Sequence, residues 1–135
     1  MFVTTQYLVL DAGSGAVQVA DGGHIPPLWY HHCTGEVEAL DLPGGPPLGV
    51  LPESIYPETT LQLEHGDSLL LLTDGVSERT NDAGEAFGFP RLLDAVRAAG
   101  RTEASFVQPI LRAVEAFTAG GRHYDDLTLV QLTWC

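Results

Sequence analysis

Four consecutive leucines, Leu69 to Leu72, are the feature that most constrains the fold of this chain. A short and uniformly apolar run of this kind predicts a β-strand that is buried on both faces. Thr73, Asp74 and Gly75 follow directly, which places a carboxylate at the end of the strand. An acid in that position usually forms a turn or caps a helix, and Asp-Gly is a common turn dipeptide. Taken alone, Asp74 therefore favours a turn over a metal ligand.

A second acidic segment changes this interpretation. Asp125 and Asp126 come just before the strand-like segment 127–132 near the C-terminus. If that strand pairs antiparallel with the leucine strand, the end of one meets the start of the other, and Asp74 and Asp125 converge. Two carboxylates at the rim of an apolar sheet repel each other and are costly to desolvate unless a cation lies between them. Because oxygen ligands suit magnesium or manganese better than zinc, the pair predicts a site for one of these ions.

The pattern elsewhere predicts an α+β fold whose strands are mainly antiparallel. Residues 11–15 are expected to form a hairpin turn, and the Pro/Gly-rich stretch 43–57 a surface loop. Meandering antiparallel strands of this sort are expected to form one sheet of a layered domain. Apolar runs bounded by turn residues predict these strands over 2–10, 16–20, 28–31, 37–42 and 59–63.

Two amphipathic helices are predicted in the second half of the chain and are expected to pack on the sheet. The first has Pro90 in its first turn and ends at Gly100. The second covers residues 105–118, with Thr102 as its cap and Gly120-Gly121 as its end. Their apolar faces comprise Leu92, Leu93, Val96 and Ala99 in the first helix and Phe106, Ile110, Val114 and Phe117 in the second.

Charge and composition narrow the class of protein. The net charge is −12, from 18 acids against 6 arginines with no lysine, so binding to nucleic acid or to an anionic membrane is not expected. A hydrophobic fraction of 44% in 135 residues suits one folded domain rather than disorder. No apolar run is long enough to span a bilayer, and the start lacks the basic residues of a signal peptide. We therefore expect a cytoplasmic protein with Cys33 and Cys135 reduced.

Several segments match motifs of one known family in the expected order. Residues 20–28 read Ala-Asp-Gly-Gly-His-Ile-Pro-Pro-Leu, where the family typically has Asn-Ala-Gly-His-x-Pro-Pro. The other matching segments are 2–4, 45–50, 66–67, 73–78 and 125–129. The chain thus resembles the PPM-type (PP2C-like) metal-dependent protein serine/threonine phosphatases. Its closest resemblance is to their bacterial branch, typified by the stage II sporulation E protein (SpoIIE) and the stress-response regulatory (RsbU-like) phosphatases.

The resemblance implies hydrolysis of phosphoserine or phosphothreonine by metal-activated water, with two Mn²⁺ or Mg²⁺ ions in a complete domain. Asp74 and Asp125 would be metal ligands, and Asp126 is the weaker candidate because the family often has asparagine in that place. Gly75 would let the backbone approach closely, and Glu78 would order the turn or the adjoining helix. The implied substrate is a phosphorylated regulatory protein of the anti-anti-sigma type, which would make the activity part of sigma factor regulation.

His24 belongs to the Gly-His-x-Pro-Pro motif, and we expect it to shape the loop near the site. A histidine in a Gly/Pro turn is more often a hydrogen-bonding brace than a catalytic group, so we favour the brace. Asp21 stands where the family usually has asparagine, which changes the local hydrogen bonding. The adjacent His31, His32 and Cys33 are not expected to bind zinc, because neighbouring residues on a strand point to opposite faces.

The family's Gly-Gly-Asp and Asp-x-x-Gly-His-Gly segments do not occur in this sequence. Residues 1–135 are therefore expected to form the C-terminal portion of an α-β-β-α sandwich that lacks the N-terminal metal-binding segments. Such a chain alone would hydrolyse phosphoprotein slowly or not at all, and the sequence leaves open a non-catalytic remnant or binding module of the same fold. Half a sandwich would also leave an apolar sheet face uncovered, which favours self-association.

Overall fold

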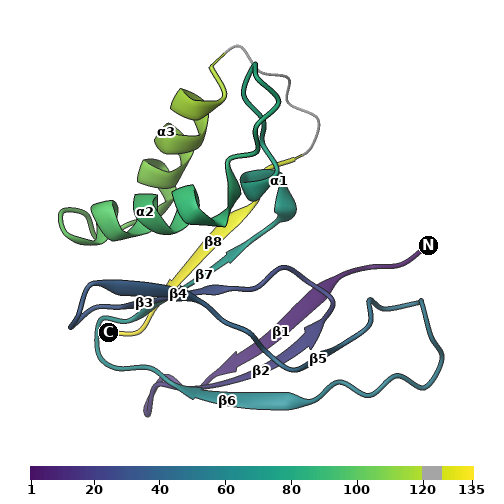
Figure 1. Cartoon of the computed structure of the whole chain (residues 1–135). Coiled ribbons are helices and arrows are strands. Elements are labelled where there is room, and N and C mark those ends of the chain that lie inside the picture. The colour runs from purple at the N-terminus through teal and green to yellow at the C-terminus, as the bar shows by residue number, and fades with distance from the viewer. Residues whose placement is uncertain (120–125) are drawn as a thin grey trace.

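The computed structural model describes residues 1–119 and 126–135. Within them, two β-sheets are stacked, and a layer of helices covers the outer face of one sheet (Figure 1). The layers therefore run helix, sheet, sheet. This arrangement confirms the predicted α+β fold with mainly antiparallel strands and two helices packed on a sheet.

The first sheet is built around β2 (Ala16–Gly22). Strand β1 (Thr5–Leu10) pairs antiparallel with one edge of β2 through the predicted hairpin turn. Strand β6 (Glu58–Gln62) pairs antiparallel with the other edge, and the two-residue β5 (Gly44–Gly45) continues that edge in a parallel sense. The strand predicted over residues 2–10 is shorter in the structure, where β1 begins at Thr5. Val3 lies outside β1 and forms an isolated bridge with Leu48.

The second sheet has the order β4-β3-β7-β8, and every pair in it is antiparallel. Its strands are β3 (Leu28–His31), β4 (Glu36–Ala39), β7 (Ser68–Leu72) and β8 (Leu129–Thr133). The prediction of a single sheet was therefore wrong. The break falls at Pro26-Pro27 between β2 and β3, where the missing backbone donors end one ladder and the chain passes to the next layer.

Strand β7 lies between two hydrophobic cores. Leu70 and Leu72 pack in the core under the helices, whereas Leu69 packs between the two sheets with Val17 and Val19. Each of the three leucines is at most 2% exposed. The leucine run is therefore buried on both faces, as its composition predicted, and the alternation of side chains along the strand divides it between the layers.

Helices α2 (Gly88–Gly100) and α3 (Val107–Phe117) form the outer layer. Their buried residues lie on the predicted faces, namely Leu92, Val96 and Ala99 in α2 and Ile110 and Val114 in α3. Thr102 does not cap α3; its hydroxyl instead donates to the carbonyl oxygen of Ala99 at 3.5 Å. The backbone N–H at the start of α3 instead finds its acceptor on β8, because Gln131 Oε1 accepts from Phe106 N at 2.8 Å. The predicted end at Gly120-Gly121 lies outside the described residues.

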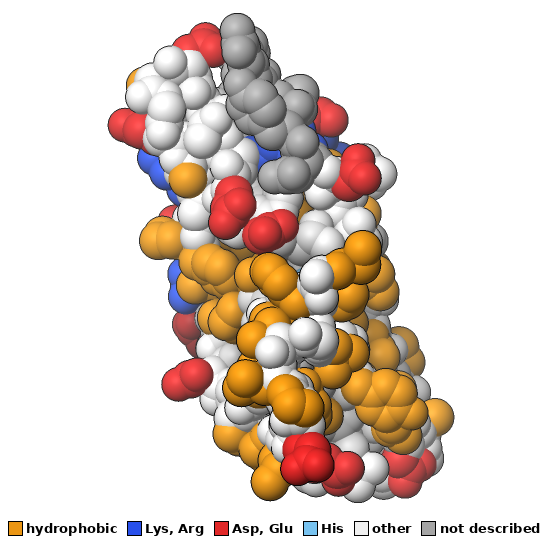
Figure 2. Space-filling model, turned by 90° about the vertical axis from the view of Figure 1, so that its right-hand side faces the viewer, with side chains coloured by type: hydrophobic (Ala, Val, Ile, Leu, Met, Phe, Trp, Pro, Cys, Tyr) orange, Lys and Arg blue, Asp and Glu red, His pale blue; other side chains and the backbone are white. Residues whose placement is uncertain are grey.

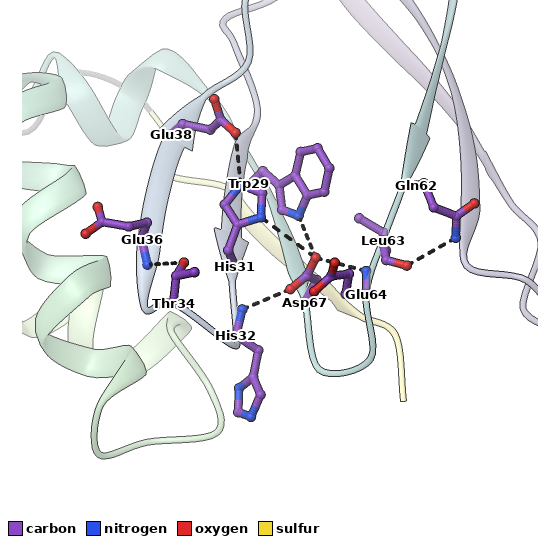
Figure 3. Close-up of polar contacts among 10 residues, drawn as sticks. All are labelled: Trp29, His31, His32, Thr34, Glu36, Glu38, Gln62, Leu63, Glu64 and Asp67. Atoms are coloured by element: carbon purple, nitrogen blue, oxygen red, sulfur yellow. Dashed lines mark hydrogen bonds and ion pairs between the residues drawn. The ribbon is translucent and has the colours of Figure 1, made fainter.

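A buried carboxylate fixes the start of β7, at the opposite end of the strand from Asp74 (Figure 3). Asp67 is 1% exposed and accepts hydrogen bonds from Trp29 Nε1 at 3.1 Å, His32 N at 2.9 Å and Glu64 N at 3.0 Å. Three donors offset the cost of burying this charge, because hydrogen bonds to an ionised acceptor are stronger than neutral ones. Asp67 therefore ties β3 to the turn that leads into β7.

The outer face of the β1–β2–β6 sheet carries no helix among the described residues (Figure 1). Tyr7 and Val9 are exposed on it, at 68% and 45%, but Gln18 and Thr60 are exposed beside them. The face is therefore mixed rather than uniformly apolar, and self-association through it stays a prediction. No helix in the described part of the chain is long and apolar enough to cross a bilayer.

Candidate functional site

The candidate site lies where the end of β7 meets the start of β8. The two strands pair antiparallel, with Leu72 opposite Leu129. One step beyond this pair, Thr73 N donates to the Thr128 carbonyl at 3.0 Å, and Thr128 N donates to Thr73 Oγ1 at 3.1 Å. The predicted meeting of these two strand ends is therefore confirmed. It places Asp74 at the same rim of the sheet as Asp126.

Gly75 lets the two segments approach closely. Gly75 is buried, and a Cβ built on it would collide with the carbonyl oxygen of Asp126. Only a residue without a side chain can occupy this position while the backbone of Asp126 stays in place. The segments that carry Asp74 and Asp126 consequently lie side by side, and both acids are exposed to solvent. Asp125 lies outside the described residues.

Asp74 begins the single-turn helix α1 (Asp74–Ser77). Its carbonyl accepts from Glu78 N at 2.8 Å and from Ser77 Oγ at 3.3 Å, which closes the turn. Thr73, not Asp74, is the N-cap residue, but its hydroxyl bonds Thr128 rather than the helix. The Asp74 carboxylate is therefore not used as a cap. Glu78 orders the turn through its backbone N–H, while its side chain is exposed.

His24 braces this rim from the other sheet. Its Nε2 lies 3.0 Å from the carbonyl oxygen of Leu72, and its Nδ1 lies 2.9 Å from Thr4 Oγ1. Because a carbonyl oxygen can only accept, Nε2 donates, and Nδ1 of the neutral ring accepts from the Thr4 hydroxyl. Gly23 turns the chain just before it, with φ of 70° and Pro47 packed against it. The imidazole thus connects the residue just before β1 and the β2–β3 loop to the residue two positions before Asp74.

Two residues of this site were not singled out from the sequence. Thr73 makes three of the hydrogen bonds between the strand ends, including a 3.5 Å bond from its hydroxyl to the Asp126 carbonyl. The sequence could have indicated Thr73, because it is a hydroxyl residue between a predicted buried strand and an acidic residue. Thr4 had no such signal, because its partner His24 lies 20 residues away and on another element.

The acids of this rim are oxygen ligands of the type that magnesium and manganese prefer. Among the described residues, however, no three side chains of His, Cys, Asp or Glu converge to hold a metal ion. The donor chemistry of Asp74 and Asp126 therefore fits such an ion, but the number of converged donors falls short of a closed site. Asp125 would add one carboxylate, and further ligands would have to come from elsewhere.

Figure 2 views the face that carries the N-terminus and the β5–β6 loop in Figure 1. Acidic side chains lie at the upper and lower ends of this face, and hydrophobic side chains spread over the part between them (Figure 2). The exposed large hydrophobic residues of the N-terminal segment and the β5–β6 loop are Met1, Phe2, Val3, Leu48, Val50, Leu51 and Ile55. The surface therefore combines an acidic rim with a broad apolar area.

A protein-family model described as Stage II sporulation protein E (SpoIIE) matches residues 1–134. The chain belongs to this family. Protein IcfG from Synechocystis sp. is 26% identical over 130 residues, and the match covers 96% of this chain but 20% of that protein. The chain therefore spans about one fifth of the curated relative that it matches.

Solved structures agree with the family assignment. The RsbU and RsbW domains of Rv1364c from Mycobacterium tuberculosis align at a TM-score of 0.76 with 26% identity, over 96% of this chain and 35% of that chain. The SiaA-PP2C domain of Pseudomonas aeruginosa aligns at 0.83 with 18% identity, over 98% of this chain and 52% of that one. This chain thus has the fold of part of a PP2C-type phosphatase domain.

Two further structural relatives are associated with divalent metals. One is the SpoIIE phosphatase domain from Bacillus subtilis presoaked with Mn, with a TM-score of 0.68 and 16% identity. The other is RsbX in complex with magnesium, with a TM-score of 0.62 and 20% identity. Relatives with this fold therefore include proteins studied with the two ions that suit a carboxylate site.

Proposed function

We propose that this chain is the C-terminal portion of a metal-dependent protein serine/threonine phosphatase domain, in which Asp74 and Asp125 are metal ligands. The observation that carries the proposal is the pairing of β7 with β8, which puts Thr73-Asp74-Gly75 against the segment that follows Asp125. Membership of the SpoIIE family supports the same assignment. The remaining ligands would come from segments outside these 135 residues.

Bound manganese or magnesium would supply a water of lowered pKa and would neutralise charge on the phosphoryl group. The residues of this chain have positioning roles. Asp74 would offer its exposed carboxylate from a closed turn, and Gly75 keeps the Asp126 backbone against that turn. His24 holds the Leu72 carbonyl and thereby the end of β7. The family resemblance implies direct hydrolysis by metal-activated water, without a covalent enzyme intermediate.

The proposed substrate is phosphoserine or phosphothreonine on a regulatory protein of the anti-anti-sigma type, and we place the activity in the cytoplasm. This assignment rests on the family, whose structural relatives include RsbU and RsbX proteins. The net charge of −12 argues for a protein substrate rather than a nucleic acid.

Manganese binding tests the proposal directly. Calorimetric titration of the full chain with Mn²⁺ should detect a site that Asp74→Asn weakens about tenfold or more, the size expected when a carboxylate ligand loses its charge. Asp82→Asn removes the same charge from another exposed position and should leave the affinity unchanged. Equal affinities for the wild type and Asp74→Asn would refute the assignment of Asp74.

Phosphate release from a phosphoserine peptide separates the phosphatase from a non-catalytic module of the same fold. We expect the chain alone to turn over slowly or not at all. Manganese-dependent release that Asp74→Asn abolishes would contradict that expectation and support catalysis by this chain.

A further inference from the structure

A second polar site lies beside the acidic rim, in a cavity of about 160 Å³ near the end of β2. Its walls combine apolar and polar groups. The apolar part comes from Pro26, Pro27, Leu40 and Leu42, and the polar part from Gln6, Asp21, His24 and Asp41. The volume is below the roughly 300–1,000 Å³ of a pocket for a drug-sized ligand, so the cavity suits the end of one side chain.

The Asp21 carboxylate is held rigidly in this cavity. Its Oδ1 accepts from Gln6 Nε2 at 3.1 Å, and its Oδ2 accepts from Gly23 N at 3.2 Å. Gly44 of β5 lies against it so closely that a Cβ at that position would be 2.6 Å from Oδ2. Each carboxylate oxygen still has a free lone pair. Asp21 is therefore a preorganised acceptor whose position does not depend on a ligand.

Gln6 leaves an acceptor without a donor. Its Nε2 donates to Asp21 Oδ1 and to the Ile25 carbonyl at 2.9 Å, which uses both amide hydrogens. Its Oε1 is buried and accepts no hydrogen bond from the described residues. A buried carbonyl without a donor costs about 1–3 kcal/mol. Because this oxygen is closed to solvent, it is not available to a ligand in the cavity, and the role of Gln6 there is to hold Asp21.

The other polar groups add acceptors and negative charge. Asp41 is exposed and makes no hydrogen bond or ion pair with the described residues. His24 has both ring nitrogens engaged, with Leu72 and Thr4, so it offers no free donor. Among the described residues, no arginine lines the cavity. It thus combines two carboxylates with apolar walls, a set that matches a flat cation with several N–H donors.

We propose that this cavity binds the guanidinium group of an arginine side chain presented by a partner protein. The guanidinium plane would pack on the proline and leucine walls, and its N–H groups would donate to Asp21 and Asp41. His24 lines the cavity and also bonds the residue two positions before Asp74, so the subsite adjoins the acidic rim. That the arginine belongs to the phosphoprotein substrate rests on the proposed function; the binding itself does not.

Titration of the ¹⁵N-labelled chain with the peptide acetyl-Gly-Arg-Gly-amide, followed by NMR, tests the proposal. Saturable shifts are expected at the Gln6 side-chain amide and the Gly23 N–H. Asp41→Asn should weaken binding about tenfold, the size of one lost charge-assisted hydrogen bond, without breaking any contact that holds the fold. Asp21→Asn should have an equal or larger effect. Asp82→Asn, an exposed acid outside the cavity, is the matched control and should bind like the wild type.

Peptides with citrulline or lysine in place of arginine complete the experiment. Weaker binding of both supports recognition of a guanidinium, whereas citrulline binding as well as arginine, or lysine binding equally, would overturn it. Unchanged affinity in both Asp21→Asn and Asp41→Asn would also overturn it. The titration needs neither a metal nor a phosphorylated substrate, so its failure is distinguishable from failure of the proposed phosphatase function.

Discussion

The closest backbone approach at the candidate site can be tested by adding one methyl group. In Gly75→Ala the new Cβ would overlap the Asp126 carbonyl oxygen. That oxygen belongs to the backbone. Thr128, two residues further along the chain, is held by two hydrogen bonds to Thr73, and these bonds oppose a movement of the Asp126 carbonyl away from Gly75. The substitution must therefore separate the segments that carry Asp74 and Asp126.

The magnitude follows from two opposing effects. Overpacking of a well-packed position costs about 1–3 kcal/mol. Alanine has a better helix propensity than glycine by about 1 kcal/mol, but α1 is a single turn, so this gain is incomplete. We expect a net loss of about 1–2 kcal/mol in the free energy of unfolding. Such a loss lowers the melting temperature by about 4 °C per kcal/mol in a domain of this size.

Urea denaturation of the full chain measures the free energy, and calorimetric titration with Mn²⁺ measures the site. Gly75→Ala should lose both stability and Mn²⁺ affinity. Gly13→Ala is the matched control, because the nearest atom to its new Cβ lies at an ordinary 3.4 Å, and it should stay within about 0.5 kcal/mol of the wild type. If Gly75→Ala were as stable as the control and bound Mn²⁺ as tightly as the wild type, the inferred overlap of the added methyl group with the Asp126 carbonyl would be refuted.

Three further predictions concern other parts of the molecule. Asp67→Asn should lower the free energy of unfolding in urea by about 2–4 kcal/mol, because three N–H donors then face a neutral amide; a loss below 0.5 kcal/mol, the size of an ordinary surface substitution, would contradict this. His24→Ala should weaken Mn²⁺ binding measured by calorimetry, whereas the exposed His65→Ala should not; equal effects would argue against the brace. The Ser14 hydroxyl and the Gly13 N–H lower the pKa of Asp11, so this carboxylate stabilises the hairpin above its ordinary pKa, and the contribution is lost as the pH falls through the lowered value. An NMR titration should give Asp11 a midpoint below the ordinary aspartate value, and a raised midpoint would be inconsistent with these bonds.

Local patterns predicted the strands and helices well because each depends on short-range periodicity. The leucine run, the hairpin at residues 11–15 and the buried faces of α2 and α3 all follow from spacing within one element. The convergence of the β7 and β8 ends also followed, because antiparallel pairing fixes which strand ends meet.

The division into two sheets and the bracing contacts could not be predicted in this way. A strand does not specify which sheet it joins, so the role of Pro26-Pro27 as the crossing point became clear only in three dimensions. The hydrogen bonds of His24 to Leu72 and of Gln131 to Phe106 join residues 48 and 25 positions apart. Such contacts depend on tertiary packing, which overrides local signals such as the capping potential of Thr102.

The place of β7 between two cores has a consequence for thermodynamic linkage. Leu69 of this strand packs in the inter-sheet core and Leu70 in the core beneath the helices, and Asp74 follows two residues after the end of the strand at Leu72. A cation bound at Asp74, as we propose, would favour the folded state by mass action, because the folded state alone holds this strand end in place. Substitutions that loosen either core would then also weaken cation binding at Asp74.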